Sequence, residues 1–153
     1  MTLTIASDPA DLATVRELFR EYADALPVDL AYQGFDTEVR DLPGPYSAPG
    51  GTLILARAGR EPVGCAGLRP GPPGSGELKR LYVRAPHRRS GVGRILVETV
   101  IEAARGRGYS TLYLDTLPSM EVARRLYLSL GFEETEPYYP SPVPDTRFFR
   151  LSL

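Results

Sequence analysis

The stretch Glu77–Gly93, ELKRLYVRAPHRRSGVG, decides how we expect this chain to fold. Its first part, Glu77–Val83, is apolar-rich and alternating, which predicts a strand. Arg88–Gly93 then turns the chain into a run with helical spacing. The two glycines of this turn leave backbone amides unshielded, and a helix N-terminus adds free N–H groups and a partial positive charge. Strand, glycine turn and helix N-terminus together predict a site for a phosphate-bearing anion.

The residues that follow this turn complete a β–α–β unit. The helix is expected to end at Arg105–Gly108, where cations and a glycine favour a C-terminus. Thr111–Thr116 predicts the next strand, and its bulky residues on both faces are typical of the centre of a sheet. Strands joined by a helix pair in parallel through a right-handed crossover. The predicted apolar stripe of the helix is Val92, Ile95, Leu96, Thr99, Val100, Ala103 and Ala104.

Antiparallel elements are predicted before this unit. Leu3–Ile5 is a short β-branched strand, and Asp8 is placed to cap a helix with a proline at its first position. Thr52–Arg57 and Pro62–Leu68 predict a hairpin around a glycine turn. Between the helix and the hairpin, residues 28–51 predict a second short helix and a loop, whose role stays open.

The C-terminal part predicts one more helix and a closing pair of strands. The helix is expected to begin at Pro118 and to carry Tyr127 on its apolar face. Glu133–Tyr138 and Thr146–Leu151 predict the two strands. The proline-rich residues 136–146 between them have no assigned role.

Length and composition narrow the class of protein. A chain of 153 residues, 42% hydrophobic and 24% charged, is typical of one globular domain, and no linker divides residues 1–153. A net charge of −1 argues against a nucleic-acid binder with a broad basic face. The single cysteine, Cys65, excludes an internal disulfide and suits a reducing cytoplasm. We see no signal-peptide pattern and no membrane-spanning run, so we expect a cytoplasmic protein without a membrane, nucleic-acid or metal partner.

The glycine turn has several interpretations. A dinucleotide-binding fingerprint would need a third glycine where Leu96 stands, and a nucleotide-triphosphate loop would need Gly-Lys-Ser/Thr, which is absent. A glycine turn without any ligand is the remaining alternative. A bound phosphate is favoured by five potential cations within eleven positions, Arg84, His87, Arg88, Arg89 and Arg94.

Two patterns resemble a known family. Arg-x-x-Gly-x-Gly at Arg88–Gly93, after a strand ending Leu-Tyr-Val, resembles the acetyl-CoA-binding motif of the GNAT superfamily of N-acetyltransferases. A second family signature follows downstream, Ala123-x-x-Leu126-Tyr127-x-x-x-Gly131-Phe132. With the strands around them, the two motifs cover most of the chain. The resemblance implies a single-domain α/β GNAT-type acyl-CoA N-acyltransferase fold, with a mixed twisted sheet, helices on both faces and acetyl-CoA as co-substrate.

The resemblance also implies roles in binding acetyl-CoA. The amides of the glycine turn would bind the pyrophosphate, and the end of the preceding strand would pair with the pantetheine arm. A splay beside that strand would open the groove for the thioester, and a backbone N–H there would stabilise the oxyanion. The cofactor-binding residues are then Leu81, Tyr82, Val83, Arg88, Arg89, Ser90, Gly91, Val92, Gly93 and Arg94.

The chemistry of acetyl transfer needs an acid for the thiolate and a base for the amine. The family's Leu-Tyr position makes Tyr127 the candidate acid, although the same tyrosine could be only a packed aromatic. Glu77 is the candidate base, or a carboxylate paired with a neighbouring cation, and Asp115 is a second candidate. Arg80, expected on the opposite strand face from Lys79, could bind a substrate carboxylate.

The predicted reaction is acetyl transfer from acetyl-CoA to a primary amine, by direct attack in a ternary complex. The acceptor stays open between a small-molecule amine, a protein N-terminus and a lysine. One alternative is a non-catalytic acyl-CoA-binding or sensing domain, and another is an interaction module without a ligand. An exposed sheet edge could pair with a second copy to form a homodimer.

Overall fold

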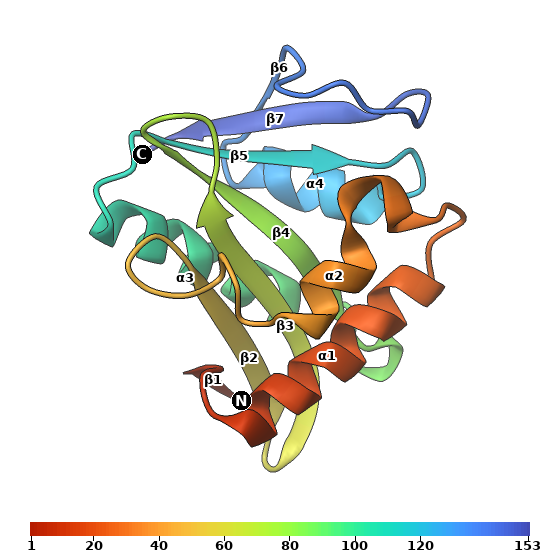
Figure 1. Cartoon of the computed structure of the whole chain (residues 1–153), viewed down its shortest axis with the longest axis vertical. Coiled ribbons are helices and arrows are strands. Elements are labelled where there is room, and N and C mark those ends of the chain that lie inside the picture. Colours follow the sequence, from red (N-terminus) through yellow and green to blue (C-terminus); the bar gives the residue numbers. More distant parts are fainter.

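The computed structural model describes residues 1–153 and contains one mixed sheet of seven strands in the order β1-β2-β3-β4-β5-β7-β6 (Figure 1). All neighbouring strands are antiparallel except β4 and β5, which are parallel, so the predicted β–α–β unit and mixed sheet are confirmed. The strands are β1 Thr2–Ile5, β2 Thr52–Ala58, β3 Glu61–Pro70, β4 Ser75–Val83, β5 Thr111–Thr116, β6 Glu133–Thr135 and β7 Arg147–Ser152. The helices are α1 Pro9–Asp24, α2 Phe35–Arg40, α3 Val92–Gly106 and α4 Glu121–Ser129, with short 3-10 turns η1 Leu30–Gln33 and η2 Ala85–His87.

Helices cover both faces of the sheet, as expected (Figure 1). The alternation of β2 supplies one hydrophobic core on each face. Leu53 and Leu55 pack with α1 and α2, whereas Ile54 and Ala56 pack with α3. None of the helices is long and apolar enough to span a membrane.

The ends of the helices follow the capping signals only in part. Asp8 caps α1 as predicted, because its carboxylate accepts from the Asp11 amide at 2.8 Å. α4 begins three residues later than predicted, because the Met120 amide closes a tight turn onto Leu117 O at 2.9 Å before the helix starts. β6 is also shorter than predicted, and the chain leaves the sheet after Thr135.

The predicted stripe of α3 is partly wrong. Ile95 is 42% exposed, while Val97 and Ile101, which the stripe omitted, are buried. α3 packs against β2, β3 and β4 together. The buried face is therefore broader than the single stripe drawn from the sequence and is centred elsewhere on the helix.

The feature that positions the site is a gap between β4 and β5. Their parallel ladder contains only three pairs and ends at Glu77 opposite Tyr113. β4 continues to Val83 without a partner on this side, and β5 continues to Thr116 along β7. Figure 1 shows β4 running away from β5 beyond this point. The splay expected from the family resemblance is therefore present.

Candidate functional site

The turn before α3 presents a row of unused backbone donors. None of the amides from Arg89 to Arg94 donates a hydrogen bond within the protein, and the first that does is Ile95, to Gly91 O at 3.1 Å. Arg89 and Gly91 both have left-handed backbone, with φ of 64° and 87°. Such turns let successive N–H groups converge on one anion. The donors that a diphosphate requires are thus present at an exposed turn.

Most cations around this turn already have partners. Arg84 pairs with Glu21 of α1 at 2.7 Å, while Arg88 and Arg94 donate to neighbouring oxygens at 2.8 and 2.9 Å. Arg89 is exposed, and its side chain makes no hydrogen bond or ion pair. Its guanidinium is therefore the cation of this cluster whose donors are all available to an anion.

The edge of β4 facing the gap connects this turn to the rest of the site. The side chains of Leu81, Tyr82 and Val83 are half-buried, and Leu81 and Val83 pack against the core around α3. Those two side chains therefore contribute to packing. Their backbone has no strand partner on the β5 side, so an extended ligand could add there as a further strand.

Tyr127 lies at the gap on α4. It is 5% exposed, its ring packs on Phe132 with 5.6 Å between centroids, and its hydroxyl makes no hydrogen bond within the protein. Burial raises the pKa of Tyr127 well above its usual value, and the charges of Tyr22 and Asp115 raise it further. Tyr127 therefore supplies a protonated phenol without an internal partner.

β4 carries a bulge where it has left β5. Arg80 and Leu81 together oppose one residue of β3, Ala66, and Arg80 has a left-handed φ of 59°. The bulge interrupts the alternation of side chains, so Lys79 and Arg80 both donate to Oε1 of Gln33, at 3.2 and 2.8 Å. The prediction that they lie on opposite faces is wrong for this reason.

The prediction that Arg80 could bind a substrate carboxylate is also wrong, because its guanidinium is already paired. Its Nε and Nη2 donate to the two carboxylate oxygens of Glu38 at 2.9 and 3.1 Å. The side chains of Arg80 and Glu38 are only 1% and 7% exposed. This ion pair ties α2 to the centre of β4, and a buried pair of this kind leaves no charge for a ligand.

A cleft of about 960 Å³ opens on the sheet beside the gap. Lys79 and Glu77 of β4 line it, together with Arg69 at the end of β3. Most of its remaining lining is proline and tyrosine from three connections between elements. The segments 28–51 and 136–146, whose roles the sequence left open, both contribute to this lining. Those prolines and tyrosines are Tyr32, Pro45, Pro70, Pro72, Pro73, Tyr138, Tyr139, Pro140 and Pro142.

Two phenols attach segment 136–146 to the strands that separate. Tyr138 donates to Oε2 of Glu77 on β4 at 2.5 Å, and Tyr139 donates to Oδ2 of Asp115 on β5. Oε1 of Glu77 accepts from Arg69 at 2.8 Å, so both of its oxygens are engaged in a side chain that is 6% exposed. The connection after β6 is thereby fixed over the cleft by one bond to each strand.

Lys79 is a buried ammonium at the floor of this cleft. Its Nζ lies 3.5 Å from Oδ1 of Asp115, and the pair spans the gap two positions beyond the last paired residues. Burial lowers the pKa of Lys79, and the charge of Asp115 offsets part of that effect. The ammonium therefore has one weak ionic partner in a nearly dry environment.

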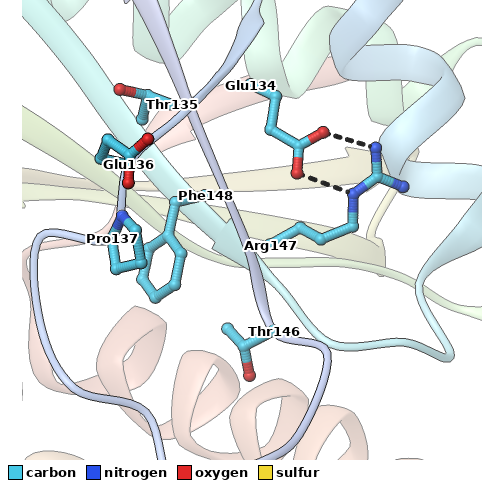
Figure 2. Close-up of a pocket in the computed structure, with 7 residues that line it drawn as sticks. All are labelled: Glu134, Thr135, Glu136, Pro137, Thr146, Arg147 and Phe148. Atoms are coloured by element: carbon cyan, nitrogen blue, oxygen red, sulfur yellow. Dashed lines mark hydrogen bonds and ion pairs between the residues drawn. The ribbon is translucent and has the colours of Figure 1, made fainter.

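Two other features lie outside this cleft. Cys65 is fully buried in β3, and burial raises the pKa of its thiol to about 12, so it is a core residue as predicted. A second hollow, of about 600 Å³, lies beside β6 and β7 and contains the ion pair of Glu134 with Arg147 at 2.7 Å (Figure 2). Phe148 closes one side of it, and the same ring contacts Tyr138 and supports the cleft wall.

Sequence reasoning missed most of the polar cleft. Glu38, Gln33 and Arg69 were not selected, because they belong to other segments and their meeting depends on the tertiary fold. One signal was available in the chain. Lys79 and Arg80 stand side by side in a strand expected to lie within the sheet, and buried cations require partners.

Comparisons with known proteins agree with this geometry. Residues 13–132 match the model of the acetyltransferase (GNAT) family. An uncharacterized N-acetyltransferase of Schizosaccharomyces pombe is 39% identical over 147 residues, which cover 95% of this chain and 90% of the relative.

Solved structures share the fold. A GNAT-family acetyltransferase from Staphylococcus aureus Mu50 aligns with a TM-score of 0.78 and 22% identity over 99% of both chains. The PaiA N-acetyltransferase of Thermoplasma acidophilum, solved in complex with coenzyme A, aligns with a TM-score of 0.77 and 18% identity over the full length of both. The family model and the fission-yeast relative together establish the family, and the solved structures establish the fold. This chain belongs to the GNAT acetyltransferase family and is an N-acetyltransferase that uses acetyl-CoA as co-substrate.

Proposed function

We propose that the protein transfers the acetyl group of acetyl-CoA to a primary amine by direct attack in a ternary complex, with residues 1–153 acting as one N-acetyltransferase domain. The observation that carries this proposal is the gap between β4 and β5. Unused amides lie before α3 at one side of it, the Tyr127 phenol lies at it, and a polar cleft lies beside it. Two substrates could therefore meet there without a covalent enzyme intermediate.

In this proposal the turn and β4 hold acetyl-CoA. The amides from Arg89 to Arg94 bind the pyrophosphate with the positive end of α3, and the Arg89 side chain adds a charge-assisted contact. The backbone of Leu81, Tyr82 and Val83 pairs with the pantetheine arm. The lack of a strand partner for this part of β4 and the free amides of the turn support these roles.

Tyr127 is the proposed general acid. Its phenol would donate a proton to the departing thiolate, whose ordinary thiol pKa is about 8.5. A raised pKa keeps the phenol protonated at neutral pH, and the lack of an internal acceptor leaves its proton available. The unpaired hydroxyl suits an acid better than a tyrosine kept only for packing, whereas the raised pKa would follow from burial in either case.

Glu77 is the proposed base. An alkylamine has a pKa near 10.4 and is mostly protonated at neutral pH, so a carboxylate in the cleft must accept its proton before attack. Glu77 lines the cleft and is held in place by Arg69 and Tyr138. Asp115 stays the second candidate, because it faces the gap from β5 and accepts from Tyr139.

The partner is proposed to be a small-molecule amine, with a protein N-terminus or lysine as the other source of the same group. Pairing with a second copy along an edge strand, β1 or β6, stays part of the proposal. Both strands end the sheet with one side unpaired.

The experiment that tests this function is thiol release from acetyl-CoA against a broad panel of amines. We expect release that depends on one class of amine and falls about 100-fold or more in Tyr127→Phe, because general acid catalysis contributes that much. Tyr109→Phe is a matched control, since its hydroxyl donates to Gly50 O outside the site. Binding of acetyl-CoA without release with any amine would instead identify a sensing domain.

A further inference from the structure

The cleft beside the gap has an excess of unused hydrogen-bond donors. Lys79 carries three N–H groups and has two acceptors, Gln33 Oε1 at 3.2 Å and Asp115 Oδ1 at 3.5 Å. Arg69 uses only Nε in a hydrogen bond, to Glu77, while its Nη1 lies 3.6 Å from the nearest carboxylate oxygen of the next ion pair. Both side chains line the cleft, so their remaining donors can reach a ligand.

The side-chain oxygens of Glu77, Gln33 and Tyr32 in the same cleft each already accept a hydrogen bond. Oε1 and Oε2 of Glu77 accept from Arg69 and Tyr138, and Gln33 Oε1 accepts from two cations. Tyr32 accepts from Gln33 Nε2 at 2.9 Å and keeps its own proton. The unused hydrogen-bonding groups of the cleft are therefore donors, which a ligand with acceptor atoms would satisfy. An anionic acceptor fits best, because the two side chains that carry these donors are charged.

Charge balance points in the same direction. Three cations lie around the floor of the cleft, each close to a carboxylate: Arg80 with Glu38, Arg69 with Glu77, and Lys79 with Asp115. A ligand that enters as a bare ammonium would add a positive charge beside Lys79 and Arg69. A ligand with both an ammonium and a carboxylate would leave the site neutral, which low-dielectric surroundings favour.

We infer that the acceptor is an amine that also carries a carboxylate, such as an amino acid, and that Lys79 and Arg69 bind this carboxylate; this rests on the proposed function, since it concerns the acceptor of that reaction. Glu77 pairs with Arg69 and lines the same cleft as Lys79, and the second lone pairs of its oxygens can accept from the ammonium of the same ligand. The tyrosines and prolines of the cleft contact its apolar part. Lys79 and Arg69 are thus specificity-determining residues.

The test compares each amino acid with the analogue that lacks its carboxylate charge. The panel contains the amino acids and their α-amides, which have nearly the same shape and lack the carboxylate charge, and the readout is kcat/KM from thiol release. We expect the best amino acid to exceed its amide by about 10- to 100-fold, because hydrogen bonds to charged groups contribute that much affinity. The amide has the less basic amine, so a preference for the acid cannot come from amine protonation.

Variants assign part of the preference to Lys79. Lys79→Met should lower the ratio of acid to amide, with Arg69 retaining the remainder, and Lys79→Arg should keep most of the ratio. Lys79→Met leaves Asp115 without its ionic partner, so the double variant Lys79→Met/Asp115→Asn keeps the pair neutral and should give the same low ratio. Acetyl-CoA affinity and the melting temperature show whether each variant is folded.

The outcomes separate the inference from the proposed function. Transfer to amides and neutral amines as fast as to amino acids, or a ratio unchanged by Lys79→Met, would overturn the inference and leave N-acetyl transfer intact. No thiol release with any amine would reject both. A peptide amide with an N-terminal aspartate tests the other source of the same chemistry. If it exceeds the free amino acids while keeping the dependence on Lys79, the carboxylate belongs to a protein N-terminus.

Discussion

The turn before α3 and the acceptor cleft are built in opposite ways. The turn consists of consecutive residues, Arg88–Gly93, and its donors are backbone amides that need only a strand, a left-handed glycine and a helix start. The cleft is assembled from β3, β4 and three connections, and the bond between Tyr138 and Glu77 joins residues 61 positions apart. The turn proposed to bind acetyl-CoA is therefore determined by residues that are neighbours in the sequence. The cleft proposed to select the acceptor depends on segments that are distant in the sequence.

This difference predicts that the cleft is coupled to global stability. Replacing Arg80 by Met should lower the free energy of unfolding by about 3–5 kcal/mol, because it leaves Glu38 charged and buried without a partner. Urea unfolding at neutral pH measures this. Arg40→Met is the control, since its ion pair with Asp41 is exposed and should leave the unfolding midpoint almost unchanged. Equal losses in the two variants would refute the coupling.

The same ion pair should make the Arg80→Met defect depend on pH. Burial alone would raise the pKa of Glu38, but hydrogen bonds and charge from Arg80 outweigh it and leave the pKa below the usual 4.5. The contribution of the pair is then complete above that value and is lost as the pH falls through the lower folded-state pKa. The difference in unfolding free energy between wild type and Arg80→Met should shrink in acid, and a difference that is constant with pH would contradict this.

Glu77→Gln should affect catalysis within the cleft and leave the turn intact. We expect turnover at neutral pH to fall about 100-fold with unchanged affinity for acetyl-CoA, because general base catalysis contributes that much. The defect should narrow as the pH approaches the amine pKa of about 10.4, where free amine no longer needs a base. Glu134→Gln, in an exposed pair that is not part of the cleft lining, is the control. An unaltered pH–rate profile would transfer the role to Asp115.

Gly91→Ala should produce the reverse pattern. At φ of 87° a Cβ costs about 1–2 kcal/mol, so the turn should distort and acetyl-CoA affinity should fall about tenfold while the KM of the acceptor stays the same. Gly106→Ala, at the other end of α3, is the control, because an added Cβ there meets no atom within 4 Å. Calorimetric titration with coenzyme A compares the two. Loss of affinity in both, or in neither, would show that the turn is not the binding element.

The smallest effect is expected for Tyr139→Phe. The ring keeps its packing on Phe148, and only the hydrogen bond to Asp115 is lost. We expect the KM of the acceptor to rise about threefold, as one hydrogen bond contributes modestly, with no change in acetyl-CoA affinity. Steady-state kinetics in both substrates measures this. A change only in the KM of acetyl-CoA would show that segment 136–146 acts on co-substrate binding and would contradict its assignment to the acceptor cleft.

The difference between contacts of sequence neighbours and contacts of distant segments also explains which features could be predicted from the sequence. Strands, helices and the glycine turn followed from alternation, caps and spacing, because those signals lie within a few residues. The bulge at Arg80 could not be foreseen, since it depends on how β4 meets β3, and with it the directions of Lys79 and Arg80 were wrong. The roles of residues 28–51 and 136–146 stayed open, because their side chains gain partners only after the sheet has formed.

The most direct test of two separate half-sites that meet at one gap is a two-substrate initial-rate study with the best amine found in the panel. Direct transfer in a ternary complex predicts intersecting double-reciprocal lines and no thiol released before the amine is added. Parallel lines, together with one equivalent of thiol released from acetyl-CoA alone, would reveal an acetylated enzyme and contradict the account.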